Sequence, residues 1–90
     1  MDLNRLLRDP TYFKIVSFFH ENPASIDTPR GVAAWTGENK QNVNRALLKL
    51  EKLKILTAHK VSSTTAYCYT RNIKLTKSVE NLLKRIKKEE

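Results

Sequence analysis

The fold is decided by residues 28–50, which read TPRGVAAWTGENKQNVNRALLKL. Thr28 and Pro29 predict the start of a helix, because an N-cap residue is followed by proline at the first helical position. Gly37 predicts its end, since glycine readily adopts the left-handed C-cap conformation. Asn39 then predicts the cap of a second helix, whose apolar residues recur at helical spacing: Val43, Ala46, Leu47, Leu50 and Leu53. The stretch therefore predicts two helices joined by a tight turn.

The residues before this pair predict one more helix. Asp9 and Pro10 repeat the start signal, and Asn22-Pro23 ends the helix. Its buried stripe is expected to comprise Tyr12, Ile15, Val16 and Phe19. Phe13 and Phe18 lie off this stripe, so we expect one of them to pack against another element or chain. Residues 1–8 carry Leu3, Leu6 and Leu7 and predict a helical turn or a docking arm.

The residues after the pair change from a helical to an alternating pattern. Residues 56–61 and 66–70 predict two strands, with a polar turn over 62–65. Thr76 predicts the cap of a last helix over 76–88, with an apolar stripe at the spacing i, i+3, i+4, i+7: Val79, Leu82, Leu83 and Ile86. The chain is thus expected to be a single, mainly α domain over 1–90 with a small β-hairpin.

This order of elements resembles the winged helix-turn-helix. The motif has a small residue, a turn glycine and then a buried residue in the second helix, and Ala33, Gly37 and Val43 stand at that spacing. Residues 50–56 resemble the end of a recognition helix that leads into the first strand of a wing. Residues 73–77 resemble the strand-to-helix junction that follows the wing in MarR-like and ArsR-like transcriptional regulators.

The resemblance covers about residues 11–86. It implies a three-helix core, a helix-turn-helix at about 28–53, a two-stranded wing at about 55–70 and a C-terminal helix. Two residues depart from the pattern: Glu38 stands at a usually apolar turn position, and Lys54 where many relatives have glycine.

Composition and charge favour a binding protein over an enzyme. Lys and Arg number 17 against nine Asp and Glu, a net charge of +8 that attracts polyanions, nucleic acid first among them. No phosphate-binding loop, metal-ligand spacing or paired acids suggest catalysis or a cofactor. The single cysteine, Cys68, excludes an internal disulfide. Without a signal peptide or an apolar run of membrane-spanning length, we expect a cytoplasmic protein.

Candidate DNA contacts follow from the exposed face of the second helix of the pair. Gln41, Asn44 and Arg45 are expected to contact bases, because Arg pairs with guanine and Asn and Gln pair with adenine. Leu48 and Lys52 fall on the same side. Residues expected to contact the DNA backbone are Thr28, Arg30, Asn39, Lys40, Lys49, Lys52, Lys60, Ser63 and Thr64. The predicted function is sequence-specific binding of double-stranded DNA by a small transcriptional regulator.

Several alternatives accompany this prediction. The same fold can serve as a protein–protein interaction module, or its basic surface can bind RNA. The apolar stripe of the last helix predicts a homodimer through Val79, Leu82, Leu83 and Ile86, or packing on the first helix of the same chain. A hairpin turn centred on residues 63 and 64 would place His59 directly opposite Cys68. That pair is a weak candidate for metal binding or redox sensing, with ordinary strand packing as the alternative.

Overall fold

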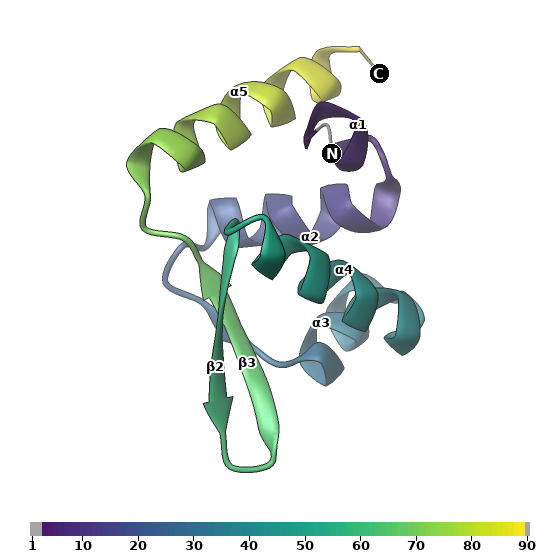
Figure 1. Ribbon diagram of the computed structural model, residues 1–90. Coiled ribbons are helices and arrows are strands. Elements are labelled where there is room, and N and C mark those ends of the chain that lie inside the picture. Colours follow the sequence, from purple (N-terminus) through teal and green to yellow (C-terminus); the bar gives the residue numbers. More distant parts are fainter. Residues whose placement is uncertain (1–2, 90) are drawn as a thin grey trace.

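The computed structural model describes residues 3–89, over which the chain forms five helices and a three-stranded antiparallel sheet (Figure 1). The elements are α1 (Leu3–Leu7), α2 (Pro10–Glu21), β1 (Ile26–Asp27), α3 (Pro29–Thr36), α4 (Lys40–Lys52), β2 (Leu56–Val61), β3 (Thr64–Tyr69) and α5 (Ile73–Lys88). The predicted domain ends at residues 1, 2 and 90 lie outside the described residues. The fold is a mixed α/β arrangement in which the helices form most of the core.

Three of the predicted helix starts are confirmed by hydrogen bonds. Asp9 Oδ1 accepts from the Thr11 backbone N–H at 2.9 Å, and Thr28 Oγ1 accepts from the Gly31 N–H at 3.2 Å. Asn39 Oδ1 accepts from the N–H groups of residues 41 and 42 at 2.7 and 3.4 Å. Gly37 is left-handed with φ 72°, and its N–H donates to the carbonyl of residue 33 at 3.0 Å. The end of α3 and the start of α4 are therefore stabilised by hydrogen bonds between residues that are close in sequence.

The start of the last helix differs from the prediction. The N-cap is Asn72, whose Oδ1 accepts from the Leu75 N–H at 3.1 Å, so the predicted cap at Thr76 is wrong. Thr76 lies inside the first turn and donates its hydroxyl to the Ile73 carbonyl at 3.0 Å. Residues 73–77 are entirely helical, so the strand-to-helix junction expected there is also absent.

The sheet contains one strand more than the predicted hairpin, because β1 pairs with the outer edge of β3. The hairpin turn is shorter than expected: Ser62 and Ser63 form a two-residue turn, with Ser62 at φ 60°. His59 consequently pairs with Ala66, and Cys68 pairs with Thr57, so the predicted direct pairing of His59 with Cys68 is wrong. Because the register differs by two residues, both side chains still share one face of the sheet.

The apolar stripe of α5 packs inside the same chain. Val79, Leu83 and Ile86 are buried together with Leu7 of α1 and Phe19 of α2, and Leu82 is partly buried against the same core. The exposed leucine stripe on which the predicted homodimer depends is therefore absent, because α1 and α2 already cover these side chains, and the structure gives no support to a dimer through them. The second interpretation, packing on the chain's own first helices, is confirmed.

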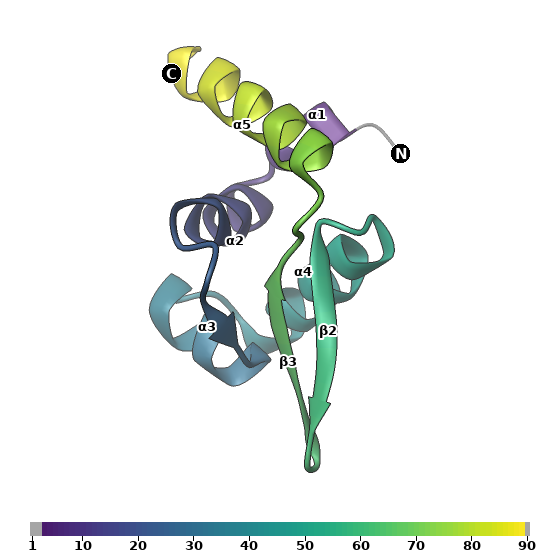
Figure 2. The ribbon, with the colours of Figure 1, turned by 90° about the vertical axis from the view of Figure 1, so that its left-hand side faces the viewer.

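Helices α1 and α5 and the tip of the hairpin lie at opposite ends of the molecule. Figures 1 and 2 show α1 and α5 at one end, while the tip of the β2–β3 hairpin projects beyond the helices at the other. His20 links three elements between these ends: its Nδ1 lies 3.1 Å from the Tyr69 hydroxyl and its Nε2 lies 3.7 Å from Glu80 Oε2. Burial, with a smaller contribution from the Glu80 carboxylate, raises the pKa of Tyr69 to about 12.

Helix α4 ends in a Schellman motif that has lysine in place of glycine. The Ile55 N–H donates to the Leu50 carbonyl at 3.0 Å, and the Lys54 N–H donates to the Glu51 carbonyl at 2.9 Å. Lys54 has φ 66°, a left-handed conformation that is costly for a residue with a Cβ atom. Glycine would adopt this conformation without the Cβ penalty.

We expect Lys54→Gly to raise the free energy of unfolding by about 0.5–1 kcal/mol, because it removes the left-handed strain. Urea denaturation at constant pH measures the change. The matched control is Glu51→Gly, three residues earlier in the helical part of α4, which should lower stability by about 1 kcal/mol. A loss of stability in Lys54→Gly would mean that the strain is outweighed by contacts of the lysine side chain.

Candidate nucleic-acid interface

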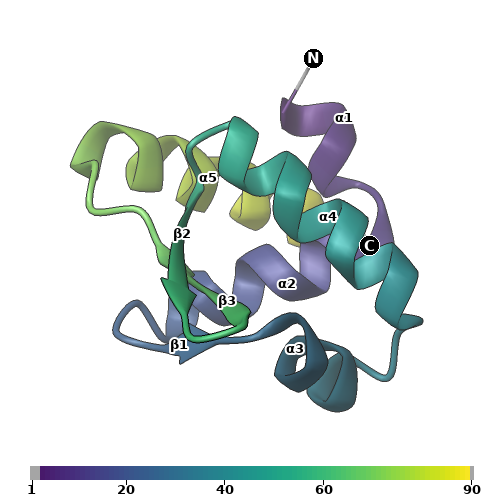
Figure 3. The same ribbon diagram turned by 60° about the horizontal axis from the view of Figure 1, so that its bottom comes forward.

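Helix α4 has one face in the core and one face in solvent. Val43, Ala46, Leu47 and Leu50 are buried, whereas Gln41, Asn44, Arg45, Leu48 and Lys52 are exposed. Figure 3 shows α4 lying across α2, and α4 also packs against α3. We name the exposed set Gln41, Asn44, Arg45, Leu48 and Lys52 the α4 face. It holds two neutral amides and two cations around one leucine, a set of side chains suited to hydrogen bonding with an anionic polymer.

The α4 face continues onto the start of α2. A hollow of about 190 Å³ lies between the two helices, lined by Asp9, Thr11, Tyr12, Asn42 and Arg45. Burial and the Asp9 carboxylate raise the pKa of Tyr12, and the Arg45 guanidinium acts in the opposite direction. The Arg45 guanidinium thus interacts electrostatically with the start of α2 and is also exposed to solvent on the α4 face.

Sequence reasoning missed Tyr12 and Asn42 as neighbours of Arg45. Asn42 precedes Arg45 by three residues, a spacing that makes two side chains neighbours on a helix. This spacing could have predicted the proximity of Asn42 to Arg45 from the sequence. Tyr12 is half-buried at the hollow, although its spacing had assigned it to the buried stripe of α2.

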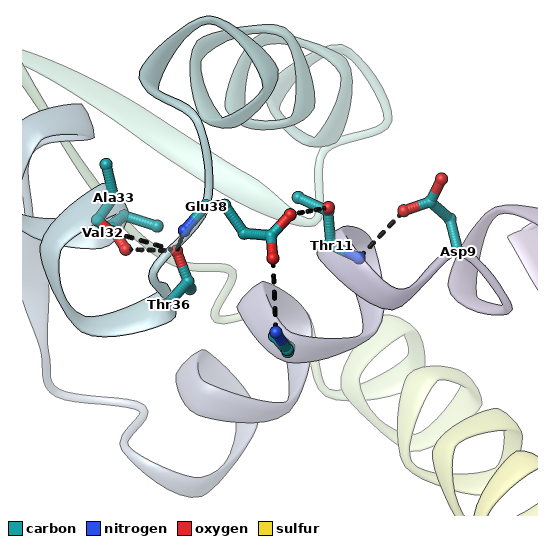
Figure 4. A network of polar contacts seen from close by, with 7 residues as sticks. Asp9, Thr11, Val32, Ala33, Thr36 and Glu38 are labelled. Carbon is teal, nitrogen blue, oxygen red and sulfur yellow. Dashed lines mark hydrogen bonds and ion pairs between the residues drawn. The ribbon is translucent and has the colours of Figure 1, made fainter.

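A polar network holds the turn between α3 and α4 against α2 (Figure 4). Glu38 Oε1 accepts from the Thr11 hydroxyl at 2.6 Å, and its Oε2 lies 3.3 Å from the Lys14 ammonium. The Glu38 N–H donates to Thr36 Oγ1 at 3.2 Å, and the Thr36 hydroxyl donates to the Val32 carbonyl at 2.7 Å. Glu38 therefore connects the turn to α2 through hydrogen bonds rather than through apolar packing.

Because the Thr11 hydroxyl and then Lys14 donate hydrogen bonds to its carboxylate, the pKa of Glu38 is lowered below its ordinary value of 4.5. A carboxylate with a lowered pKa in the folded state stabilises the fold above its unfolded pKa, and this contribution disappears as the pH falls through the folded pKa. We expect Thr11→Val and Lys14→Met each to return the pKa of Glu38 toward 4.5, because each removes a hydrogen bond to the carboxylate. Side-chain carboxyl NMR titration measures both shifts.

Acid unfolding gives a second readout of the same interaction. Below pH 4.5, Glu38→Gln should lose less stability with falling pH than the unmodified chain, because glutamine has no proton to bind. Glu89, whose pKa is lowered by a hydrogen bond from Arg8, keeps its own contribution to the pH dependence in this variant. An unshifted Glu38 pKa in Thr11→Val would contradict the assigned role of the hydroxyl.

The predicted backbone-contact residues occupy three places around the α4 face. Lys40 and Lys52 are exposed on α4 itself, and Lys49 is half-buried there. Thr28 and Asn39 use their side-chain oxygens as helix caps, so each positions a helix, while Arg30 is exposed beside the Thr28 cap. Lys60, Ser63 and Thr64 are exposed at the projecting end of the hairpin. The structure thus separates the predicted contacts into a group on α4, a group at the helix starts and a group on the hairpin.

His59 and Cys68 are in contact despite the changed register. His59 Nε2 lies 3.4 Å from Cys68 Sγ, diagonally across β2 and β3. The pair belongs to the sheet face opposite to Lys60, because successive side chains of a strand alternate between faces. It is therefore separate from the α4 face.

Neither the rest of the described structure nor similarity to known proteins adds residues to this candidate interface. Over residues 3–89, no group of three or more His, Cys, Asp and Glu side chains is placed to hold a metal ion. None of the helices described is both long enough and apolar enough to cross a bilayer. No family model matches the chain, and neither a curated protein nor a solved structure shows significant similarity to it.

Proposed function

We propose that the chain is a small transcriptional regulator that binds double-stranded DNA as a winged helix-turn-helix, with α4 in the major groove. The observation that carries the proposal is the α4 face: Gln41, Asn44 and Arg45 are exposed along a helix whose opposite side is buried. The major groove is about 12 Å wide and admits one helix. Arginine can pair with guanine there, and the amides of asparagine and glutamine can pair with adenine.

The two groups of outlying contacts support the same orientation. Lys40, Lys49 and Lys52 extend the positive charge along α4, and phosphate contacts of this kind fix position without reading sequence. The hairpin projects from the molecule and offers Lys60, Ser63 and Thr64 for the flanking backbone. The net charge of +8 adds long-range attraction to a polyanion.

The first experiment is a titration of labelled mixed-sequence duplex DNA with the protein between about 50 and 200 mM salt. We expect affinity to fall steeply, with a log–log slope of about −0.9 for each phosphate neutralised. Lys52→Ala should reduce the slope by about 1. Lys88→Ala is the matched control: Lys88 is exposed on α5 and is not part of the α4 face, so it should leave the slope unchanged.

Each rival function predicts a different result in this experiment. Preference for a single-stranded RNA probe over the duplex would favour RNA binding. No duplex binding at the lowest salt would contradict the proposal and favour a protein–protein module. Such a module would keep its partner when Arg45 and Lys49 are replaced by alanine, because it has no need of a cationic α4.

A further inference from the structure

We propose that His59 and Cys68 form half of a zinc site, which a second copy of this chain completes. The proposal does not depend on DNA binding. Both side chains lie on the exposed hairpin, with His59 Nε2 3.4 Å from Cys68 Sγ. Imidazole nitrogen and thiolate sulfur are the two ligand types that zinc uses most in structural sites.

The distance between the two atoms suits joint coordination of one ion. Zinc–sulfur bonds of about 2.3 Å and zinc–nitrogen bonds of about 2.0–2.1 Å, at a tetrahedral angle, place the two ligand atoms about 3.5 Å apart. The observed 3.4 Å separation is already close to that value, so both ligands can reach one ion without a change of strand register. On binding, the thiol loses its proton and the hydrogen bond between the pair is replaced by two bonds to the metal.

The surroundings of the pair favour a second copy of the chain as the source of the missing ligands. We name this surface the uncharged sheet face; alternation and register assign to it Ile26, Thr57, His59, Val61, Thr64, Ala66 and Cys68. None of these seven residues is Lys, Arg, Asp or Glu. Ile26 is 68% exposed directly beside Cys68, and Val61 is 54% exposed two residues from His59.

Charge and ligand number lead to the same arrangement. Two chains that each carry +8 repel one another, and the uncharged sheet face adds no charged side chain of its own to that repulsion. A structural zinc ion takes four protein ligands, whereas one chain offers two. Two faces related by a two-fold axis supply two cysteines and two histidines, a complete tetrahedral set.

Of the proposed DNA contacts on the hairpin, Thr64 belongs to the uncharged sheet face, whereas the cationic contact Lys60 does not. Lys60 stands between His59 and Val61 in β2 and pairs with Thr65. Because successive side chains of a strand point to opposite faces, Lys60 lies on the face opposite to His59 and Val61. Zinc binding and duplex binding can therefore be measured separately on the same protein, and the failure of one leaves the other standing.

The experiment measures zinc stoichiometry and molar mass with the reduced, tag-free chain. Equilibrium dialysis against ZnCl₂ should give one zinc ion per two chains, and light scattering should show the molar mass doubling with zinc and returning to that of one chain with EDTA. Cys68→Ser and His59→Gln should each abolish the doubling. His20→Gln is the matched control, because His20 contacts Tyr69 and Glu80 instead and should leave zinc binding unchanged.

A second variant separates the shared site from a site on one chain. Ile26→Lys keeps both ligands but places like charges beside the two-fold axis, so it should abolish the zinc-dependent doubling. Three results would overturn the proposal: one zinc ion bound per chain without dimerisation, no zinc bound at all, or a reduced dimer that persists in EDTA.

Discussion

Arg45→Ala is expected to weaken binding to the preferred duplex by about 5- to 150-fold, the effect of losing one bidentate base contact worth about 1–3 kcal/mol. Arg45 is exposed near the middle of the α4 face, where its guanidinium also lies beside the hollow at the start of α2. Its loss should relax the preference at one base pair and leave the preferences at other positions unchanged. Selection from a randomised duplex pool, followed by titration of the selected sequence, measures both effects.

The matched control for this result is Arg85→Ala. Arg85 is an exposed arginine on α5, at the end of the molecule away from the hairpin, so the same chemical change there should alter affinity by less than the base contact does. If Arg45→Ala weakened all sequences equally, Arg45 would be a phosphate contact and its assignment to a base would be wrong.

The features of this candidate interface that could be predicted are those that depend on residues close together in the sequence. The caps at Asp9, Thr28 and Asn39 and the left-handed Gly37 each depend on a few neighbouring residues. The two sides of α4 follow from helical periodicity over 13 residues. Either Phe13 or Phe18 is also expected to pack on another element, and the ring centroid of Phe18 lies 4.1 Å from that of Trp35 in α3.

The parts that could not be predicted depend on tertiary context. Glu38 meets Thr11 across 27 residues, a contact that no local pattern shows. Strand β1 has two residues, too few for an alternating pattern to reveal. The turn at Ser62 uses a positive φ without the glycine or asparagine that usually indicates it.

The stripe on α5 illustrates a different limit of sequence analysis. Periodicity established that Val79, Leu83 and Ile86 must be covered, but it carried no information about which surface covers them. The five-residue helix α1 supplies part of that cover through Leu7, and its sequence is too short to predict a docking position. An amphipathic helix therefore predicts burial with much greater certainty than it predicts a partner.

Leu47→Ala is expected to lower the free energy of unfolding by about 2–5 kcal/mol, because it leaves a cavity where the side chain is fully buried. Small domains have about 5–15 kcal/mol of stability in total, so this change removes a large share. At about 4–8 °C for each kcal/mol in a domain of this size, the melting temperature should fall by at least about 8 °C. Urea denaturation and thermal melting by circular dichroism measure the loss.

The next residue in the chain provides the matched control. Leu48 is 54% exposed on the α4 face, so Leu48→Ala makes the same chemical change on the opposite side of the helix and should alter stability by no more than about 0.5 kcal/mol. The pair thus tests the orientation of α4, on which every proposed base contact depends. Similar losses in the two variants would mean that α4 is rotated about its axis, and Gln41, Asn44 and Arg45 would then no longer share the exposed face.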